Sequence, residues 1–488
     1  MKVLLITPYI NLNVVDTTLE RDDFYPSAAS LHLAAVLRAN NHEPVILDLN
    51  NAIVHSKRKG YLEYCKKIII ENLEKHKPDL VGINCLFSGI FSDLLKFAET
   101  IKSHSPKLKI ATGGIHPTSF YKEILSNCND IDYVSIGEGE KTLVSLANSI
   151  ENNNQENLDD VLDKIKSFAF RDKSGKVKFN LERDFIDDLD SLPMPAWDLI
   201  DIDQYAMNLS NYYNPKKLPL KYKAAIFSSR ACPLACNFCD MFLVMGKKHR
   251  KRSVKTIVNE MEYLNKELGI NYFSFMDDQL TLNRGHVFQL CDEITNRGLN
   301  IQFDTPNGIW INSIREDLIA KMVETGLVKI NLPIEHGDDY MRNTVIGKNL
   351  AREKIYEVAE LCKKYNLMTS GYFLMGFPED TNETLQNNYD MMMELQLDNM
   401  NMFTVIPFPE TALFKQAVKD NLLIGKWNLD ELWKTPISHT QEDFLIQPYN
   451  MNIDDLRKWR KKFDNIKYKF STTNPKENIY QDKTWVST

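Results

Sequence analysis

The first third of the chain alternates short apolar runs with longer amphipathic stretches. The apolar runs predict buried strands at residues 3–6, 45–49, 80–84, 108–114 and 133–136. The stretches between them predict helices near residues 27–39, 59–75 and 91–103. Strands that alternate with helices indicate a doubly wound, parallel α/β sheet, which we assign to residues 1–145.

Ligands of such Rossmann-like sheets bind at the carboxyl ends of the strands. Glycine and polar residues gather at these positions, where backbone can approach a ligand closely. They are Thr7, Pro8, Ser88, Gly113, Gly114, His116, Gly137 and Glu138. The first turn lacks the G-x-G-x-x-G pattern, so the sequence does not favour a nicotinamide-binding domain.

A second alternation of strands and helices occupies residues 221–411. Apolar runs predict strands at 224–228, 272–276, 301–304, 328–334, 368–375 and 400–406. Helices are predicted at 253–268, 285–297, 315–325, 352–365 and 383–395. Six strand–helix units predict a partial (β/α)6 barrel, whose active site would lie at the carboxyl ends of its strands.

The remaining segments have weaker patterns. Residues 146–220 are assigned to a linker, with a hairpin-like turn at Asp172–Gly175 and two prolines, Pro193 and Pro195, that oppose regular structure. Residues 412–488 are assigned to a mainly helical C-terminal cap of uncertain role, with helices near 412–421 and 453–468. Residues 470–488 are expected to form a polar tail or lid.

Composition indicates an ordinary globular protein of 488 residues, with 43% hydrophobic and 26% charged residues. The net charge of −7 argues against nucleic-acid binding, which needs a basic surface. No apolar run approaches the length of a membrane span, and the first apolar run is too short for a signal peptide, so we expect a cytoplasmic protein. Five of the eight cysteines are scattered singly and do not suggest a disulfide framework.

The other three cysteines, Cys232, Cys236 and Cys239, lie within eight positions and follow the first barrel strand. Their spacing is C-x3-C-x2-C, with Phe238 before the last one. A closed zinc site needs four ligands, and His249 is the only additional nearby candidate. Three thiolates suit a four-iron cluster that leaves one iron open to bind and cleave a substrate.

This motif resembles that of the radical S-adenosylmethionine (SAM) superfamily. The resemblance implies that the open iron chelates the amino and carboxylate groups of SAM. The SAM amino group needs an acidic partner, for which Asp277 or Asp278 is the candidate, and Glu335 is placed for the ribose. An apolar slot for the adenine is expected from Phe238, Met375, Gly376 and Pro407. The alternative for each acidic residue is a solvated strand end or a helix cap.

The first 145 residues resemble the cobalamin-binding domains that are fused to radical SAM enzymes. The resemblance rests on the order of the helix after Pro26, the Gly113-Gly114-x-His116 segment and the Ile136–Glu140 segment. It implies cobalamin contacts from Thr7, Pro8, Gly113, Gly114, His116, Gly137 and Glu138. The D-x-H-x-x-G motif, whose histidine ligates cobalt in other cobalamin proteins, is absent, so His116 could equally be a packing residue. Some relatives keep this domain as a scaffold without cobalamin.

Together the two resemblances imply a radical SAM enzyme that uses a 4Fe-4S cluster to cleave SAM to a 5′-deoxyadenosyl radical. The expected outcome is methylation of an unactivated carbon of a small molecule, with cobalamin as methyl carrier and flavodoxin or ferredoxin as electron donor. No catalytic side chain is assigned. The alternatives are a cyclase, dehydratase, epimerase or rearrangement enzyme, laid out like the anaerobic magnesium-protoporphyrin cyclase, and a cobalamin or cluster sensor without turnover.

Overall fold

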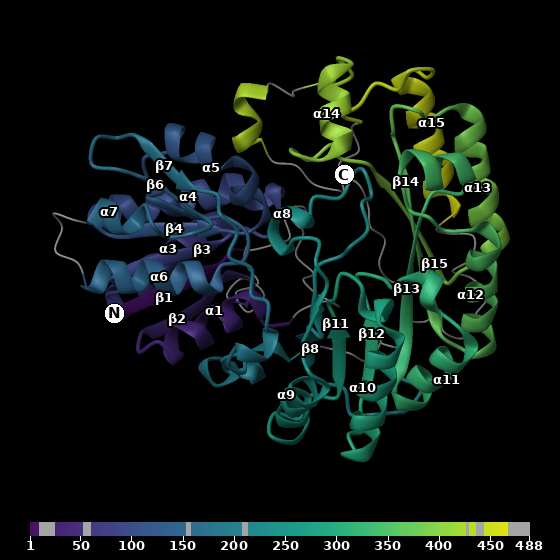
Figure 1. Cartoon of the computed structure of the whole chain (residues 1–488), viewed down its shortest axis with the longest axis horizontal. Helices are drawn as coiled ribbons and strands as arrows, with labels where there is room; N and C mark the ends of the chain where they lie inside the picture. The colour runs from purple at the N-terminus through teal and green to yellow at the C-terminus, as the bar shows by residue number, and fades with distance from the viewer. Residues whose placement is uncertain are drawn as a thin grey trace. The chain divides into compact units, whose positions relative to one another are not determined.

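The structure, a computed structural model, describes residues 1–8, 25–51, 60–152, 158–206, 213–425, 429–435 and 444–466. The chain forms two compact units (Figure 1). Unit 1 contains Met1–Ala206, Asp240–Gly246 and the described part of residues 427–438. Unit 2 contains the rest of the chain.

Unit 1 is built on a seven-stranded sheet in the order β2-β1-β3-β4-β5-β6-β7. The first five strands in this order are parallel, as predicted: β2 (Glu43–Asp48), β1 (Lys2–Thr7), β3 (Leu80–Asn84), β4 (Lys109–Gly113) and β5 (Tyr133–Ser135). The helices between and after them are α1 (Ala28–Ala39), α3 (Tyr61–His76), α4 (Phe91–His104), α5 (Ile115–Asn127), α6 (Glu140–Asn152) and α7 (Leu158–Leu162). The carboxyl ends of the parallel strands therefore share one edge, as the sequence predicts.

The linker assignment for residues 146–220 needs correction. The predicted hairpin is present as β6 (Phe168–Arg171) and β7 (Val177–Asn180), but β6 pairs antiparallel with β5 and extends the first sheet. Farther along, Trp197 is buried and the Ala196 amide donates to the Leu31 carbonyl of α1 at 3.1 Å. Unit 1 thus continues to Ala206, because strand pairing and burial hold this segment to the sheet.

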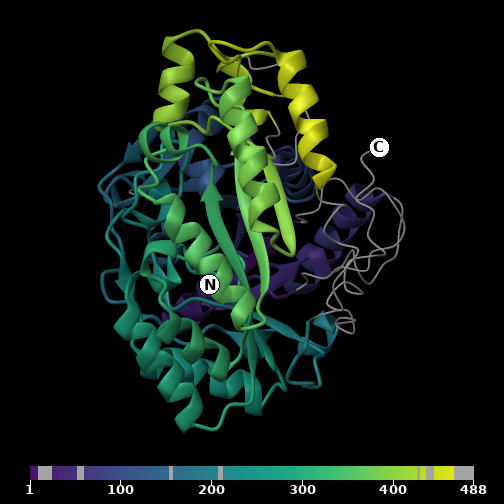
Figure 2. The same ribbon diagram turned by 90° about the vertical axis from the view of Figure 1, so that its right-hand side faces the viewer.

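Unit 2 contains six parallel strands in the order β15-β14-β13-β12-β11-β8. Their bounds confirm the six predicted strands: β8 (Lys223–Ile226), β11 (Tyr272–Phe275), β12 (Gln302–Thr305), β13 (Leu327–Glu335), β14 (Met368–Met375) and β15 (Asn399–Thr404). A short antiparallel pair, β9 (Ser229–Arg230) and β10 (Arg250–Lys251), flanks the cysteine loop. Helices α11, α12 and α13 lie outside the strands (Figures 1 and 2).

The predicted helices of unit 2 are confirmed with shifts of a few residues at their ends. They are α9 (Val254–Lys266), α10 (Arg284–Asn296), α11 (Glu316–Thr325), α12 (Arg352–Lys364), α13 (Asn382–Leu395), α14 (Ala412–Lys419) and α15 (Ile453–Asp464), with the short α8 (Phe242–Met245) in unit 1. Ser253 caps α9 as predicted, since its side chain accepts from the Thr256 amide. Gly326 ends α11 at φ 142°, and an added Cβ there would lie 2.3 Å from the Ile301 carbonyl oxygen.

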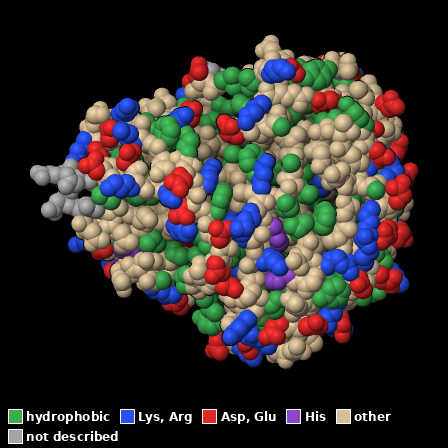
Figure 3. All heavy atoms as spheres, in the orientation of Figure 1, with side chains coloured by type: hydrophobic (Ala, Val, Ile, Leu, Met, Phe, Trp, Pro, Cys, Tyr) green, Lys and Arg blue, Asp and Glu red, His purple; other side chains and the backbone are tan. Residues whose placement is uncertain are grey.

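The predicted tail, residues 470–488, lies outside the described residues. Among the residues that the structure does describe, no helix is long and apolar enough to cross a membrane. On the face drawn in Figure 3, acidic and basic side chains are interspersed, in keeping with the net charge of −7.

Candidate functional site

The cysteine loop follows β9 and is held in place by backbone hydrogen bonds from distant segments. The Asn237 amide donates to the Ile346 carbonyl at 3.0 Å, and the Asn237 carbonyl accepts from the Leu413 amide at 3.0 Å. The three cysteines are half-buried, and none of the eight cysteines, all of which lie among the described residues, forms a disulfide. The loop thus presents three thiols outside any disulfide from a backbone that is held on two sides.

Burial raises the pKa of the Cys236 thiol to about 11 and also raises the pKa of Cys232, while the nearby Lys348 ammonium opposes both shifts. Within the described part of the chain, no group of three His, Cys, Asp or Glu side chains converges to hold a single metal ion. In a four-iron cluster each thiolate binds a different iron, so the sulfur atoms need not converge on one point. The donor set therefore fits a cluster better than a single zinc ion.

Phe238 connects the cysteine loop to the end of β14. Its ring lies 6.4 Å from the ring of Phe377, edge to face, and it packs against the apolar cluster that includes Phe377 and Leu374. Met375 and Gly376 immediately precede Phe377, and Met375 is fully buried. Pro407, just past β15, is also buried. The structure thus brings Phe238 beside the turn that contains Gly376.

The two aspartates after β11 have different environments. Asp277 is buried, and its carboxylate accepts from the Ser228 amide at 3.0 Å and from the hydroxyls of Ser228 and Ser229 at 2.6 and 2.5 Å. Asp277 therefore ties the end of β11 to β8. Asp278 keeps partial exposure, and burial, followed by repulsion from Asp277, raises its pKa to about 6.

Glu335 ends β13 with an unusual backbone conformation, φ 70°, in the left-handed region. Its Oε1 accepts from Lys348 Nζ at 2.7 Å, and both side chains are about nine-tenths buried. The ammonium also lies near the thiols of Cys232 and Cys236. Sequence reasoning missed Lys348, whose only sequence signal is a lysine after Gly347 in the turn that follows Glu335.

In unit 1, several of the predicted strand-end residues form hydrogen bonds within the unit. Thr7 Oγ1 lies 2.7 Å from Ser30 Oγ, and the Pro8 carbonyl accepts from the Asn50 side chain at 3.0 Å. The Glu138 carboxylate is buried and accepts from the Ile186 amide at 2.9 Å. Glu138 is thus a structural tie to the segment after β7.

The glycines at this edge permit very close approach of backbone. Gly113 ends β4, and its carbonyl accepts from the Cys85 amide at 2.8 Å. An added Cβ at Gly114, whose φ is 112°, would lie 2.2 Å from the Cys85 carbonyl oxygen. At Gly137, φ 89°, an added Cβ would lie 2.8 Å from Arg183 Nη1. Gly114 needs glycine for conformation and for space, whereas Gly137 needs it for its positive φ, because the end of the Arg183 side chain can shift.

His116 is occupied by a structural role. Its ring is buried between Phe91 and Phe120, with centroid distances of 4.2 and 4.8 Å. Nε2 donates to the Trp433 carbonyl at 2.7 Å, and burial lowers the pKa of His116 to about 4. Of the two interpretations that the sequence left open, the geometry favours a packing histidine.

The edge of the first sheet fits a flat, largely apolar ligand. Leu86 and Phe87, just beyond β3, are 47% and 44% exposed, although both are large hydrophobic residues. Contiguous exposed apolar surface marks ligand or partner sites, and these two adjacent residues are candidates for such a surface. With His116 engaged elsewhere, these residues fit a cobalamin that is held by backbone and apolar contacts rather than by that imidazole.

Comparison with protein families separates the two halves of the chain. Residues 226–392 match the radical SAM superfamily, and residues 15–147 match the B12 binding domain. The chain is a radical SAM enzyme with a B12-binding domain. The first domain implies SAM and a four-iron cluster as cofactors, and the second implies cobalamin.

Several proteins of known sequence are similar to this chain over most of its length. This chain is 27% identical over 427 residues to an uncharacterized methyltransferase of Pyrococcus horikoshii. The alignment covers 87% of this chain and 84% of that protein. The chain is 27% identical over 462 residues to the cytidylyl-2-hydroxyethylphosphonate methyltransferase of Streptomyces wedmorensis, covering 86% and 82%. It is also 27% identical over 412 residues to the anaerobic magnesium-protoporphyrin IX monomethyl ester cyclase of Cereibacter sphaeroides. That alignment covers 80% of this chain and 63% of the cyclase.

Among solved structures, the radical SAM methyltransferase TsrM from Kitasatospora setae, with cobalamin and a [4Fe-4S] cluster bound, has a TM-score of 0.65. The identity is 18%, with 86% of this chain and 78% of that chain covered, so this likeness concerns the fold. It confirms the fold class predicted from the sequence, an α/β sheet domain followed by a radical SAM domain and a helical C-terminal region.

Proposed function

We propose that this enzyme transfers a methyl group to an unactivated carbon of a small-molecule substrate. The observation that carries the proposal is the similarity to two relatives that are named methyltransferases and are matched over more than four-fifths of their lengths. A partly exposed loop with three cysteines that form no disulfide supports cluster binding in this chain.

In this proposal Cys232, Cys236 and Cys239 hold the cluster. Asp278 binds the SAM ammonium, because its carboxylate is partly accessible while Asp277 is saturated by three donors. Glu335 binds the ribose through Oε2, since Oε1 is paired with Lys348. The adenine slot is formed by Phe238, Met375, Gly376 and Pro407.

Cobalamin, when bound, supplies the methyl group for transfer. We propose that it lies on the carboxyl edge of the first sheet, against Leu86 and Phe87 and the backbone of Gly113, Gly114 and Gly137. Thr7, Pro8 and Glu138 shape this edge through their own hydrogen bonds. His116 contributes packing only, for the reasons given above.

The test uses the full-length protein, reconstituted anaerobically with iron, sulfide and cobalamin. It is incubated with a reductant, SAM carrying a deuterated methyl group, and a small-molecule extract, and products are followed by mass spectrometry. The proposal predicts extract-derived products that carry the labelled methyl group and are absent with Cys232→Ala. Formation of 5′-deoxyadenosine that depends on the extract but gives no labelled product would refute methyl transfer.

That second outcome would support a cyclase or another radical reaction without methyl transfer. The similarity to the magnesium-protoporphyrin cyclase is the observation that favours this alternative. A sensor without turnover predicts neither labelled product nor 5′-deoxyadenosine that depends on the extract. The same experiment therefore separates all three.

We also propose a cytoplasmic location and a low-potential electron donor such as flavodoxin or ferredoxin. The three cysteines must remain thiols to bind iron, and a reducing compartment keeps them so. Electron transfer from each purified donor to the reconstituted protein, followed by the cluster absorbance, tests the partner.

A further inference from the structure

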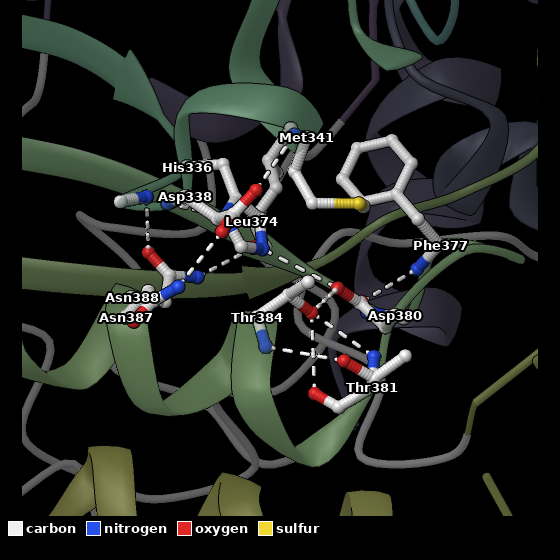
Figure 4. A network of polar contacts seen from close by, with 12 residues as sticks. His336, Asp338, Met341, Leu374, Phe377, Asp380, Thr381, Thr384, Asn387 and Asn388 are labelled. Atoms are coloured by element: carbon white, nitrogen blue, oxygen red, sulfur yellow. Dashed lines mark hydrogen bonds and ion pairs between the residues drawn. The ribbon is translucent and has the colours of Figure 1, made fainter. Parts of the chain in front are cut away.

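The ends of β13 and β14 are joined by a buried polar network (Figure 4). His336 follows Glu335 directly, and its Nδ1 accepts from the Asp338 amide at 3.0 Å. Nε2 therefore carries the proton and donates to Asp380 Oδ1 at 3.3 Å. Both side chains are fully buried. The imidazole is thus held in one tautomer between the two strand ends.

Asp380 secures the turn after β14. Its Oδ2 accepts from the Gly376 amide at 2.7 Å and from the Phe377 amide at 2.9 Å. Hydrogen bonds from backbone amides to a carboxylate are among the stronger ones in proteins. One carboxylate therefore fixes Gly376 on one side and, through His336, the residue after Glu335 on the other.

Helix α13 supports the same two strand ends from outside. Asn388 is fully buried, its Oδ1 accepts from the Gly337 amide at 2.9 Å, and its Nδ2 donates to the Leu374 carbonyl at 3.1 Å. An added Cβ at Gly337 would lie 2.5 Å from the Asn387 carbonyl oxygen, so the helix backbone lies directly against the turn. The spacing of the two strand ends is thus set by the helix.

Glu335 needs such support. A non-glycine residue in the left-handed region persists only where its surroundings over-determine it. The pairing of β13 with β14 is also irregular between Pro333 and Glu335, and irregular pairing of this kind often serves to re-aim a side chain. The hydrogen bonds of His336, Asp380 and Asn388 therefore hold the backbone next to Glu335 at the point where regular β13–β14 pairing is interrupted.

We propose that His336 and Asp380 are positioning residues, which hold Glu335 and Gly376 at the separation required by the ribose and adenine of SAM. The inference rests on the proposed function, because Glu335 and Gly376 matter here only as SAM contacts. Neither His336 nor Asp380 touches SAM in this arrangement. Both act through the strand ends that they join.

The test compares Asp380→Asn with Asp398→Asn in the full-length, cluster-reconstituted protein. Asp398 is the matched control, since its Oδ2 also accepts from an amide and a hydroxyl, both of Thr369, at 2.8 and 2.9 Å. It holds the opposite end of β14. Equilibrium dialysis measures the dissociation constants of SAM and of its 2′-deoxyadenosyl analogue, and iron content is measured in parallel.

Asp380→Asn is expected to raise the dissociation constant of SAM about tenfold, which corresponds to the net free energy of one hydrogen bond. Binding of the analogue should be weakened less, because the analogue already lacks a ribose hydroxyl. The dissociation constant of the analogue divided by that of SAM should therefore fall. Asp398→Asn should leave the ratio and the iron content at wild-type values. If Asp380→Asn does not fold, His336→Phe, which keeps a buried ring and removes both hydrogen bonds, is judged by the same ratio.

The inference is overturned if the folded variants bind both ligands within about twofold of the wild type, or if Asp398→Asn changes the ratio equally. In either case the wild type still binds SAM, and the proposed function stands. A wild-type protein that carries its cluster yet binds no SAM would instead refute the proposed function, and the inference with it.

Discussion

The buried pair of Lys348 and Glu335 leads to a sharp prediction for Lys348→Met. Lys348 Nζ lies 2.7 Å from Glu335 Oε1, and the two side chains are 8% and 10% exposed. Methionine keeps most of the volume of the lysine stem and removes the charge. The substitution therefore leaves a carboxylate in a site that was built around an ammonium.

The magnitude follows from the geometry. At 2.7 Å and an effective dielectric constant of about 20, the gross attraction is about 6 kcal/mol, most of which offsets the desolvation of the two charges. Removing one partner of a buried pair typically costs about 3–5 kcal/mol, because the remaining charge has no compensation. Local opening of this region should become roughly two hundred- to five thousandfold more frequent.

Hydrogen exchange of the amides in β13 and in residues 336–350 measures this opening in the full-length chain. Lys354→Met is the matched control, because its partner, Glu357, is 2.7 Å away but 49% exposed, and such pairs contribute about 0–1 kcal/mol. The double variant Lys348→Met/Glu335→Gln should recover most of the protection, since no charge is left unpaired. Wild-type exchange in Lys348→Met, or no recovery in the double variant, would refute the reasoning.

Three further predictions concern the remaining site residues. Burial raises the pKa of Asp278 to about 6, so SAM affinity should fall about tenfold per unit below pH 6 and become independent of pH in Asp278→Asn, as measured by calorimetry. The unfolded pKa is about 3.9, so the folded chain holds this proton more tightly, and the contribution of Asp278 to stability falls as the pH rises from about 4 to about 6. His116→Phe should keep the wild-type cobalamin content, measured from the absorbance spectrum, and should lower the free energy of unfolding by about 1 kcal/mol. Loss of cobalamin from a folded His116→Phe variant would instead indicate that His116 binds the cofactor. Gly114→Ala should lower the melting temperature far more than Gly175→Ala, which has a similar positive φ but open space around it, and equal shifts would contradict the predicted clash.

The barrel strands and the cysteine motif could be predicted because their signals are local. An apolar run between polar segments identifies a strand by itself, and all six strands of unit 2 lie within a few residues of their predicted bounds. The C-x3-C-x2-C spacing likewise needs no tertiary information. Because parallel strands share a carboxyl edge, the sequence also indicated which ends of the strands would form the site.

Other features depend on contacts between residues far apart in the chain. The sequence predicts a hairpin-like turn at residues 172–175, but only the pairing of β6 with β5 shows that the hairpin belongs to the first sheet. Asp277 and Asp278 are equivalent in sequence, and they differ because Ser228 and Ser229 surround one of them. The sequence leaves the role of His116 open, and the hydrogen bond of its Nε2 to the Trp433 carbonyl joins residues 317 positions apart.

Periodicity and spacing are properties of neighbouring residues, so they are enough to predict the two α/β domains, the order of their strands along the chain and a cluster of three thiols. Which side chains already have a hydrogen-bond partner depends instead on contacts between residues far apart in the chain. The packing of the strand ends places Lys348 against Glu335. It also places Asp380 between His336 and Gly376. A hydrogen-bonding atom that is already paired within the fold is not available to a ligand, and this pairing is set by the tertiary structure.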